Sequence, residues 1–269
     1  QLARRSSLPA ECFEALPEIT DRMRRVDVFH LRGQHKSGKT TFIPLLAVDC
    51  AEKARKCENE RMNRPLDSDF SILQSAKFSL KFMIVVMSAN EALSLREYYS
   101  EIYPGMNINV YLAPSGNSCP DKLLAMRQRH ELVGNRMWSG MLPANIVQTT
   151  GGVSGIHGII VDYETATRVI EKGGFVGTIF LDSAQCFSQQ RLFTQLVGLI
   201  AHKLDWQDSP SDNPDWRSIG RLVFIDSGCD MNCYITRTMK KLGEECRLKV
   251  GGFKFPDPKV VIPSEKSEL

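Results

Sequence analysis

One segment of the chain, Gly33-Gln34-His35-Lys36-Ser37-Gly38-Lys39-Thr40, has the residue types and spacing of a phosphate-binding loop. It matches the pattern GxxxxGK[ST] at every fixed position. Backbone N–H groups of such a loop, and of the helix that it opens, point at the β-phosphate of a nucleotide. Lys39 is then expected to reach the β- and γ-phosphate oxygens, and the Thr40 hydroxyl to bind Mg²⁺. The segment predicts a nucleoside triphosphate site.

The residues expected to contact the nucleotide lie in this loop and at the start of the next helix. They are Gly33, Lys36, Ser37, Gly38, Lys39, Thr40 and Thr41. The alternative is a glycine-rich turn that carries a lysine. His35 and Lys36 could touch phosphate or face solvent.

A phosphate-binding loop needs a second acidic group, at the end of a buried strand, to hold Mg²⁺. The apolar run 176–181 ends in Asp182, which we expect to be this magnesium ligand. Asp226 is the alternative, because it ends the apolar run 222–225 in the same way. Either aspartate could also merely cap a turn.

Short apolar runs alternate with segments of helical periodicity along the chain. Helices are expected at 41–55 (with Pro44 in the first turn), 91–102, 120–133, 164–172 and 188–204. Strands are expected at 26–32, 82–87, 108–112, 145–148, 176–181 and 222–225, and a loop at 58–69. Alternation of this kind predicts an α/β fold with a mostly parallel sheet and helices on both faces.

Composition places the chain among ordinary globular proteins. Of its 269 residues 42% are hydrophobic and 24% charged, which suffices for a full core, and no charge-free window is long enough to span a membrane. The net charge of +3 permits a nucleic-acid partner without arguing for one. The eight cysteines form no CxxC pair, which favours reduced thiols in a cytosolic protein. Since the sequence begins with Gln1, we expect a processed product or part of a longer protein.

The segment Gly38-Lys39-Thr40-Thr41-Phe42-Ile43-Pro44 resembles the GKTTxIP start of the first helix in superfamily-two helicases. Later segments resemble the motifs of that family in the family's order. They are 85–92 for motif Ia, 146–152 for motif Ib, 180–185 for the DEAH or DECH box, and 223–228 for the strand and SAT motif. The resemblance covers roughly residues 26–230, and it is nearest to viral helicases of the potyvirus, hypovirus and flavivirus kind.

The resemblance implies a RecA-like P-loop domain, the first lobe of a helicase, that uses ATP or another NTP with Mg²⁺ and acts on single-stranded RNA. It implies catalytic roles for Lys39, Asp182 and Gln185. Contacts to the nucleic-acid backbone are implied for Ser88, Asn90, Thr149, Thr150 and Gly151. Such contacts position a strand without reading its sequence. Thr149 and Thr150 could instead cap a helix.

Two departures from the family bear on catalysis. Ser183 stands where the family has the glutamate that polarises the attacking water, and a hydroxyl lacks that basicity. Gln185 stands where the box usually ends in histidine. We also expect the second lobe, which supplies arginine fingers in the family, to be absent from these residues, because 246–269 is too short to form it. We therefore expect this chain to bind a nucleotide better than it hydrolyses one.

The domain organisation implied by the resemblance is an N-terminal extension at 1–25, the first lobe at 26–245, and a strand or linker toward a second lobe at 246–269. One functional hypothesis is an RNA helicase lobe in a viral protein, located in host cytoplasm or the virion. The other is a catalytically impaired helicase-like domain with a nucleotide-sensing or structural role in a replication complex or capsid. An unrelated P-loop enzyme, such as a small kinase, is the third possibility.

Overall fold

The computed structural model describes residues 10–61, 76–112, 157–172, 175–184, 191–204, 218–227 and 234–256. Its helices are α1 (Ala10–Met23), α2 (Lys39–Arg61), α4 (Ala89–Ile102), α8 (Tyr163–Glu171), α9 (Arg191–Lys203) and α10 (Tyr234–Glu245), with a short 3₁₀ turn, η2 (Ala76–Phe78). Its strands are β1 (Val28–Gly33), β2 (Phe82–Val86), β3 (Asn107–Tyr111), β4 (His157–Asp162), β5 (Gly177–Leu181), β6 (Ile219–Ser227) and β7 (Val250–Lys254). None of the helices in the described ranges is long and apolar enough to cross a membrane.

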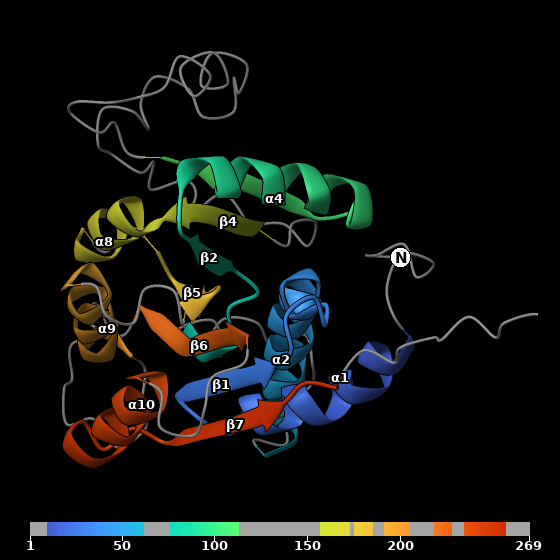
Figure 1. Ribbon diagram of the computed structural model, residues 1–269. Helices are drawn as coiled ribbons and strands as arrows, with labels where there is room; N and C mark the ends of the chain where they lie inside the picture. Colours follow the sequence, from blue (N-terminus) through green and yellow to red (C-terminus); the bar gives the residue numbers. More distant parts are fainter. Residues whose placement is uncertain are drawn as a thin grey trace, which may run out of the picture.

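The described strands form one seven-stranded sheet in the order β3-β4-β2-β5-β6-β1-β7 (Figure 1). Every pairing in it is parallel. The carboxyl ends of all seven strands therefore meet at one edge, where ligands bind in open α/β sheets. The predicted α/β fold with a mostly parallel sheet is confirmed.

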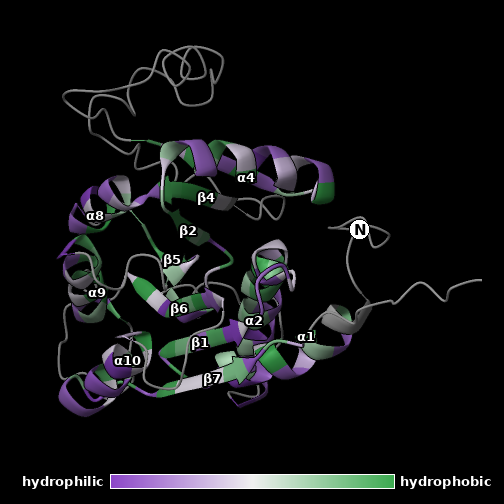
Figure 2. Ribbon diagram, viewed as in Figure 1, coloured by the Kyte–Doolittle hydropathy of each residue, from purple (hydrophilic) through white to green (hydrophobic). Residues whose placement is uncertain are grey.

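Helices cover both faces of the sheet, as predicted. On one face α1, α2 and α4 pack on side chains such as Phe29, Phe180 and Val223. On the other face α8, α9 and α10 pack on a second set that includes Leu181 and Phe224. Successive strand residues belong to opposite faces, which is why the central strands are apolar along their whole length. Figure 2 shows hydrophobic strands inside and hydrophilic outer surfaces on the helices.

Helix α2 differs from its predicted bounds at both ends. It begins at Lys39, so Pro44 is the sixth helical residue and lies beyond the first turn. It also continues to Arg61, into a segment expected to be a loop. Within that segment the helix contains Glu58, Glu60 and Arg61, and both residue types have good helix propensity. In addition, Arg55 donates from Nε to the carbonyl oxygen of Phe78 at 2.7 Å, which ties this part of the helix to η2.

The two ends of the described chain meet at one side of the sheet. β7 pairs with β1 along its length, from Val28↔Val250 to Arg32↔Lys254. α1 packs against α2, and its Arg22 guanidinium lies 5.3 Å from the ring centroid of Phe253 in β7. The predicted boundary between 245 and 246 thus falls between α10 and β7. The predicted helix at 120–133 and strand at 145–148 lie outside the described residues.

Candidate nucleotide site

The predicted phosphate loop connects the carboxyl end of β1 to the start of α2. Lys36 and Gly38 have positive φ angles of 62° and 89°, and the Ser37 N–H donates to the Gln34 carbonyl oxygen at 3.3 Å. Positive φ suits the glycine and reverses the chain tightly. A Cβ atom on Gly33 would lie 2.9 Å from the Cβ atom of Phe255, so this position leaves no room for a side chain. The loop is therefore a compact turn that opens a helix.

Lys39 is folded into this loop and is only 4% exposed. Its ammonium donates to the carbonyl oxygens of Gly33 at 2.9 Å and Gln34 at 2.5 Å, and to the Ser37 hydroxyl at 3.1 Å. A lysine ammonium has three protons to donate. A positive charge is thus held at the centre of the loop, where the backbone N–H groups already favour an anion.

Thr40 and Asp182 come together at the start of α2, although 142 positions separate them. The Thr40 hydroxyl lies 3.0 Å from Oδ1 and 2.9 Å from Oδ2 of Asp182. Asp182 directly follows β5, and its N–H donates to the Val85 carbonyl oxygen of β2 at 3.0 Å. The pairing of β5 with β2 therefore fixes the Asp182 carboxylate at the carboxyl edge of the sheet. The structure brings this predicted pair into direct contact.

The Asp182 carboxyl is 4% exposed, and its environment perturbs its protonation. Burial raises its pKa to about 6, against the opposing hydrogen bonds from the Thr40 hydroxyl and the Ser183 N–H. The Glu91 carboxylate raises the pKa further, whereas the Lys39 ammonium lowers it. A buried carboxylate with a raised pKa has too little positive charge around it, and a bound cation would correct this.

Asp226, the alternative magnesium ligand, occupies a different environment. It is fully buried in β6, and its Oδ2 lies 3.2 Å from Nε2 of His30. It shares a strand face with Phe224, which belongs to the core beneath α8, α9 and α10, whereas Asp182 shares one with Phe180, beneath α1, α2 and α4. The two aspartates thus point to opposite faces of the sheet, and only Asp182 faces Thr40.

Ser183, at the position of the family's glutamate, adopts a left-handed backbone conformation with φ 52°. Its N–H donates to Oδ1 of Asp182 at 2.9 Å, and its side chain is partly buried. The residue therefore supports the Asp182 carboxylate through its backbone. Gln185, the other predicted residue of this segment, lies outside the described residues.

The predicted nucleic-acid residues Ser88 and Asn90 stand at the start of α4, on the same sheet edge as Asp182. Ser88 is the N-cap, and its hydroxyl accepts from the Glu91 N–H at 3.2 Å. The Glu91 carboxylate accepts from the Met87 N–H at 2.9 Å, so the helix start is well satisfied. Ser88 and Asn90 are exposed. Thr149, Thr150 and Gly151 lie outside the described residues.

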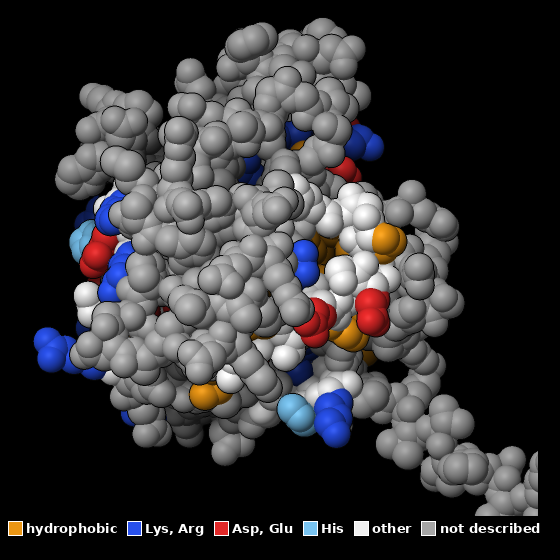
Figure 3. All heavy atoms as spheres, turned by 90° about the horizontal axis from the view of Figure 1, so that it is seen from above, with side chains coloured by type: hydrophobic (Ala, Val, Ile, Leu, Met, Phe, Trp, Pro, Cys, Tyr) orange, Lys and Arg blue, Asp and Glu red, His pale blue; other side chains and the backbone are white. Residues whose placement is uncertain are grey.

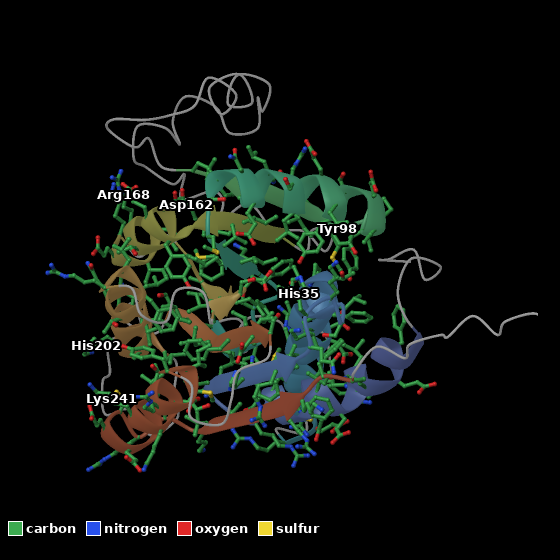
Figure 4. All side chains as sticks on the ribbon, in the orientation of Figure 1. His35, Tyr98, Asp162, Arg168, His202 and Lys241 are labelled. Carbon is green, nitrogen blue, oxygen red and sulfur yellow. The ribbon has the colours of Figure 1, made fainter. Side chains whose placement is uncertain are left out.

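Sequence reasoning did not identify the tyrosines in α4 and at its C-cap that contact the start of α2. Tyr99 and Tyr103 donate to backbone carbonyl oxygens of Thr40 and Thr41, and the Tyr98 hydroxyl lies 2.9 Å from that of Thr41. Figure 4 shows Tyr98 on the side of α4 toward α2, with His35 of the loop on the same side of the molecule and His202 and Lys241 far from both. The signal in the sequence was Pro44, which leaves one helical carbonyl without its usual donor.

Charges of both signs act on the Asp182 carboxylate, from Glu91 and from Lys39. The coloured side chains visible from above include Lys and Arg beside Asp and Glu (Figure 3). Within the described ranges, no group of three or more His, Cys, Asp or Glu residues could hold a metal ion by itself. Magnesium commonly takes several of its ligands from a nucleotide or from water.

No protein-family model matches the chain, and no curated protein matches it either. Among solved structures, it is similar to the Hef helicase domain of Pyrococcus furiosus, with 12% identity and a TM-score of 0.44, over 94% of this chain and 40% of that one. It is also similar to a nuclease-deletion mutant of the Type ISP restriction-modification enzyme LlaGI, in complex with a DNA substrate mimic, with 13% identity and a TM-score of 0.42, over 81% of this chain and 15% of that one. The chain spans less than half the length of either.

The fold itself is of the α/β type predicted from the sequence. A parallel sheet has helices on both faces, and a loop of the phosphate-binding pattern joins a sheet strand to a helix start. β6 lies between β1, which precedes that loop, and β5, which precedes Asp182.

Proposed function

We propose that this chain is the nucleotide-binding first lobe of a superfamily-two helicase-like protein and that it binds ATP or another NTP with Mg²⁺. The contact between the Thr40 hydroxyl and the Asp182 carboxylate, beside the Lys39 ammonium, carries this proposal. A hydroxyl and a carboxylate from distant segments meet at the start of a helix whose N-terminus favours anions.

The donor set fits magnesium, which prefers oxygen ligands and usually keeps several waters. Thr40 and Asp182 would hold the ion, and when bound it would neutralise charge on the β- and γ-phosphates. Lys39 would exchange contacts with Gln34 and Ser37 for phosphate oxygens. The loop backbone would orient the phosphates. The raised pKa of Asp182 supports a cation here, because the buried charge is otherwise undercompensated.

The proposal extends to single-stranded RNA as partner. Its support is the exposure of Ser88 and Asn90 at the start of α4, on the sheet edge that also carries Asp182. Thr149, Thr150 and Gly151 would complete the strand contact. The order of the motif-like segments supports a viral helicase lineage, with a second lobe supplied by the rest of a longer protein.

Ser183 favours a second candidate, a helicase-like domain that binds nucleotide without turning it over. The described part of the site places Ser183 beside Asp182 with its N–H committed to that carboxylate. A serine hydroxyl is too weakly basic to activate water without a partner base. Such a domain would act as a nucleotide sensor or as a structural part of an assembly.

The test is equilibrium binding of Mg·ATP and Mg·ADP to the wild-type chain and to Lys39→Ala, with phosphate release followed with and without single-stranded RNA. We expect Lys39→Ala to abolish binding, because it removes the charge at the centre of the loop. The control is Lys240→Ala in α10, whose lysine is 73% exposed and remote from the loop. RNA-stimulated release would favour the motor lobe, and binding without release the sensor. Unchanged affinity in Lys39→Ala would refute the site.

A further inference from the structure

Two buried tyrosines, Tyr99 in α4 and Tyr103 directly after its end, hold the first turns of α2 by their hydroxyl groups. Tyr99 donates to the carbonyl oxygen of Thr40 and Tyr103 to that of Thr41, each at 2.5 Å. Their rings pack edge to face with centroids 5.8 Å apart, and they are 1% and 0% exposed. α4 is thus joined to α2 at the residue that faces Asp182.

The two carbonyl groups differ in what the helix offers them. In an α-helix the carbonyl oxygen of residue i accepts from the N–H of residue i+4. The partner of Thr40 is Pro44, which has no N–H, whereas the partner of Thr41 is Leu45, which has one. The Tyr99 hydroxyl therefore occupies the place of the donor that the helix lacks. Tyr103 adds a second donor to a carbonyl that already has a helical partner available.

Thr40 is the residue for which such support matters most. Its side-chain hydroxyl lies within 3.0 Å of both Asp182 oxygens, while its carbonyl oxygen accepts from Tyr99. An unpaired buried carbonyl would be free to seek another donor and to tilt the peptide at the start of the helix.

We infer that Tyr99 is a positioning residue of the proposed nucleotide site: it replaces the hydrogen bond that Pro44 cannot donate and so holds the Thr40 hydroxyl toward Asp182, where Mg²⁺ would bind. This inference rests on the proposed function insofar as Thr40 binds a metal–nucleotide complex. It also gives α4, whose start carries Ser88 and Asn90, a direct mechanical connection to Thr40. A displacement of α4 on binding nucleic acid would then move Thr40.

The experiment compares Tyr99→Phe, Pro44→Ala and the double variant in the full chain. Phenylalanine keeps the ring and removes only the donor, and alanine at 44 restores a helical N–H for Thr40. The first readout is the ratio of ATP affinities with Mg²⁺ and with EDTA, which isolates the metal ligands from the rest of the loop. We expect Tyr99→Phe to reduce this ratio roughly tenfold, as loss of one hydrogen bond to a buried group implies. Pro44→Ala should restore most of it.

Tyr103→Phe, with and without Pro44→Ala, is the matched control. It removes the same group from a neighbouring carbonyl, but that carbonyl already has Leu45, so Pro44→Ala should not rescue it. Rescue specific to Tyr99 supports the inference, since a merely structural role for both tyrosines predicts equal behaviour. An unchanged Mg²⁺ ratio in Tyr99→Phe, or equal rescue of both tyrosine variants, overturns it.

The second readout, urea unfolding of the same variants, separates this inference from the proposed function. If the wild-type chain binds no nucleotide, the proposed function fails. The urea midpoints alone then show whether the Tyr99 hydroxyl replaces the N–H donor that Pro44 lacks. Recovery of the Tyr99→Phe midpoint by Pro44→Ala, without recovery of Tyr103→Phe, then supports the exchange. If Tyr99→Phe lowers the urea midpoint equally in the presence of Pro44 and of Pro44→Ala, the exchange is overturned.

Discussion

At the scale of single residues, Asp182 is subject to opposing physical demands. Its position at the end of β5 brings it to Thr40 and Lys39, but it also removes the carboxylate from water. Two hydrogen bonds to the charged form do not offset burial, so its pKa is raised to about 6. The charge that would bind a cation therefore costs stability when no cation is present.

This cost predicts a pH-dependent gain in stability for Asp182→Asn in the nucleotide-free protein. Because the folded-state pKa of about 6 exceeds the ordinary value of 3.8, folding favours the protonated carboxyl. That contribution is fully present below about pH 3.8 and is lost as pH rises through 6. At pH 8 Asp182→Asn should raise the free energy of unfolding by about 3 kcal/mol, and near pH 4 by little. Urea unfolding at both pH values measures the difference.

Asp21 provides a control of opposite sign. The hydrogen bond from Arg24 lowers the pKa of this exposed carboxyl, so its contribution is present at high pH and is lost on acidification. Asp21→Asn should therefore lose stability at pH 8 rather than gain it. An Asp182→Asn protein less stable than the wild type at pH 8 would contradict the prediction.

The contact between Thr40 and Asp182 could be predicted because both residues belong to local patterns: a fixed spacing, and a carboxylate at the end of an apolar run. Tyr99 could not, because its role depends on α4 lying beside α2. Pro44 shows that one carbonyl lacks a donor, but no local rule tells which side chain supplies it. The choice between Asp182 and Asp226 likewise depended on which face of the sheet each side chain meets.

At the scale of elements, glycine positions show how tightly the strands and helices are packed. In β6, a Cβ atom on Gly220 would lie 2.3 Å from the carbonyl oxygen of Ala76 in η2, so backbone approaches backbone there. In α9, a Cβ atom on Gly198 would have no neighbour within 4 Å. Packing therefore requires glycine at position 220, where the backbones approach closely. It does not require glycine at position 198.

Alanine at these two positions should change stability in opposite directions. Gly198→Ala should raise the free energy of unfolding by about 0.5–1 kcal/mol, because alanine lowers the backbone entropy lost in a helix. Gly220→Ala should lower it by about 1–3 kcal/mol or more, because η2 has to shift away from β6. Thermal and urea unfolding of both variants measure this. Equal effects of the same sign would show that the contact between η2 and β6 is not rigid.

The existence of most elements followed from hydrophobic periodicity, but their ends did not. The charged end of α2, up to Arg61, has a loop-like composition, and its helical state depends on local pairs such as Arg61 with Glu58 at 2.7 Å and on the contact between Arg55 and η2. The strand order could not be read from the sequence at all, because it depends on which crossovers the chain takes.

At the scale of the whole molecule, β7 joins the end of the described chain to the candidate nucleotide site. β1 lies between β6 and β7, so β7 covers the outer edge of the strand that leads into the phosphate loop. Just after β7, the Phe255 N–H donates to the Arg32 carbonyl oxygen at 2.6 Å. Its ring lies 5.9 Å from that of Phe42 in α2, between centroids. These contacts argue that β7 and Phe255 work as part of the lobe.

Phe255→Ala tests this against the prediction that 246–269 is a strand or linker toward a second lobe. Phe255 is 1% exposed, and its Cβ atom lies where Gly33 leaves space. Loss of the Phe255 ring should lower the free energy of unfolding by about 3–5 kcal/mol, as for other buried aromatic residues. It should also weaken Mg·ATP binding, because the start of the phosphate loop loses its packing. Val250→Ala is the control: that side chain is 41% exposed, and we expect a change within about 0.5 kcal/mol. If both variants unfold like the wild type, the segment after α10 is a separable linker, and the phosphate loop is held by β1 and α2 alone.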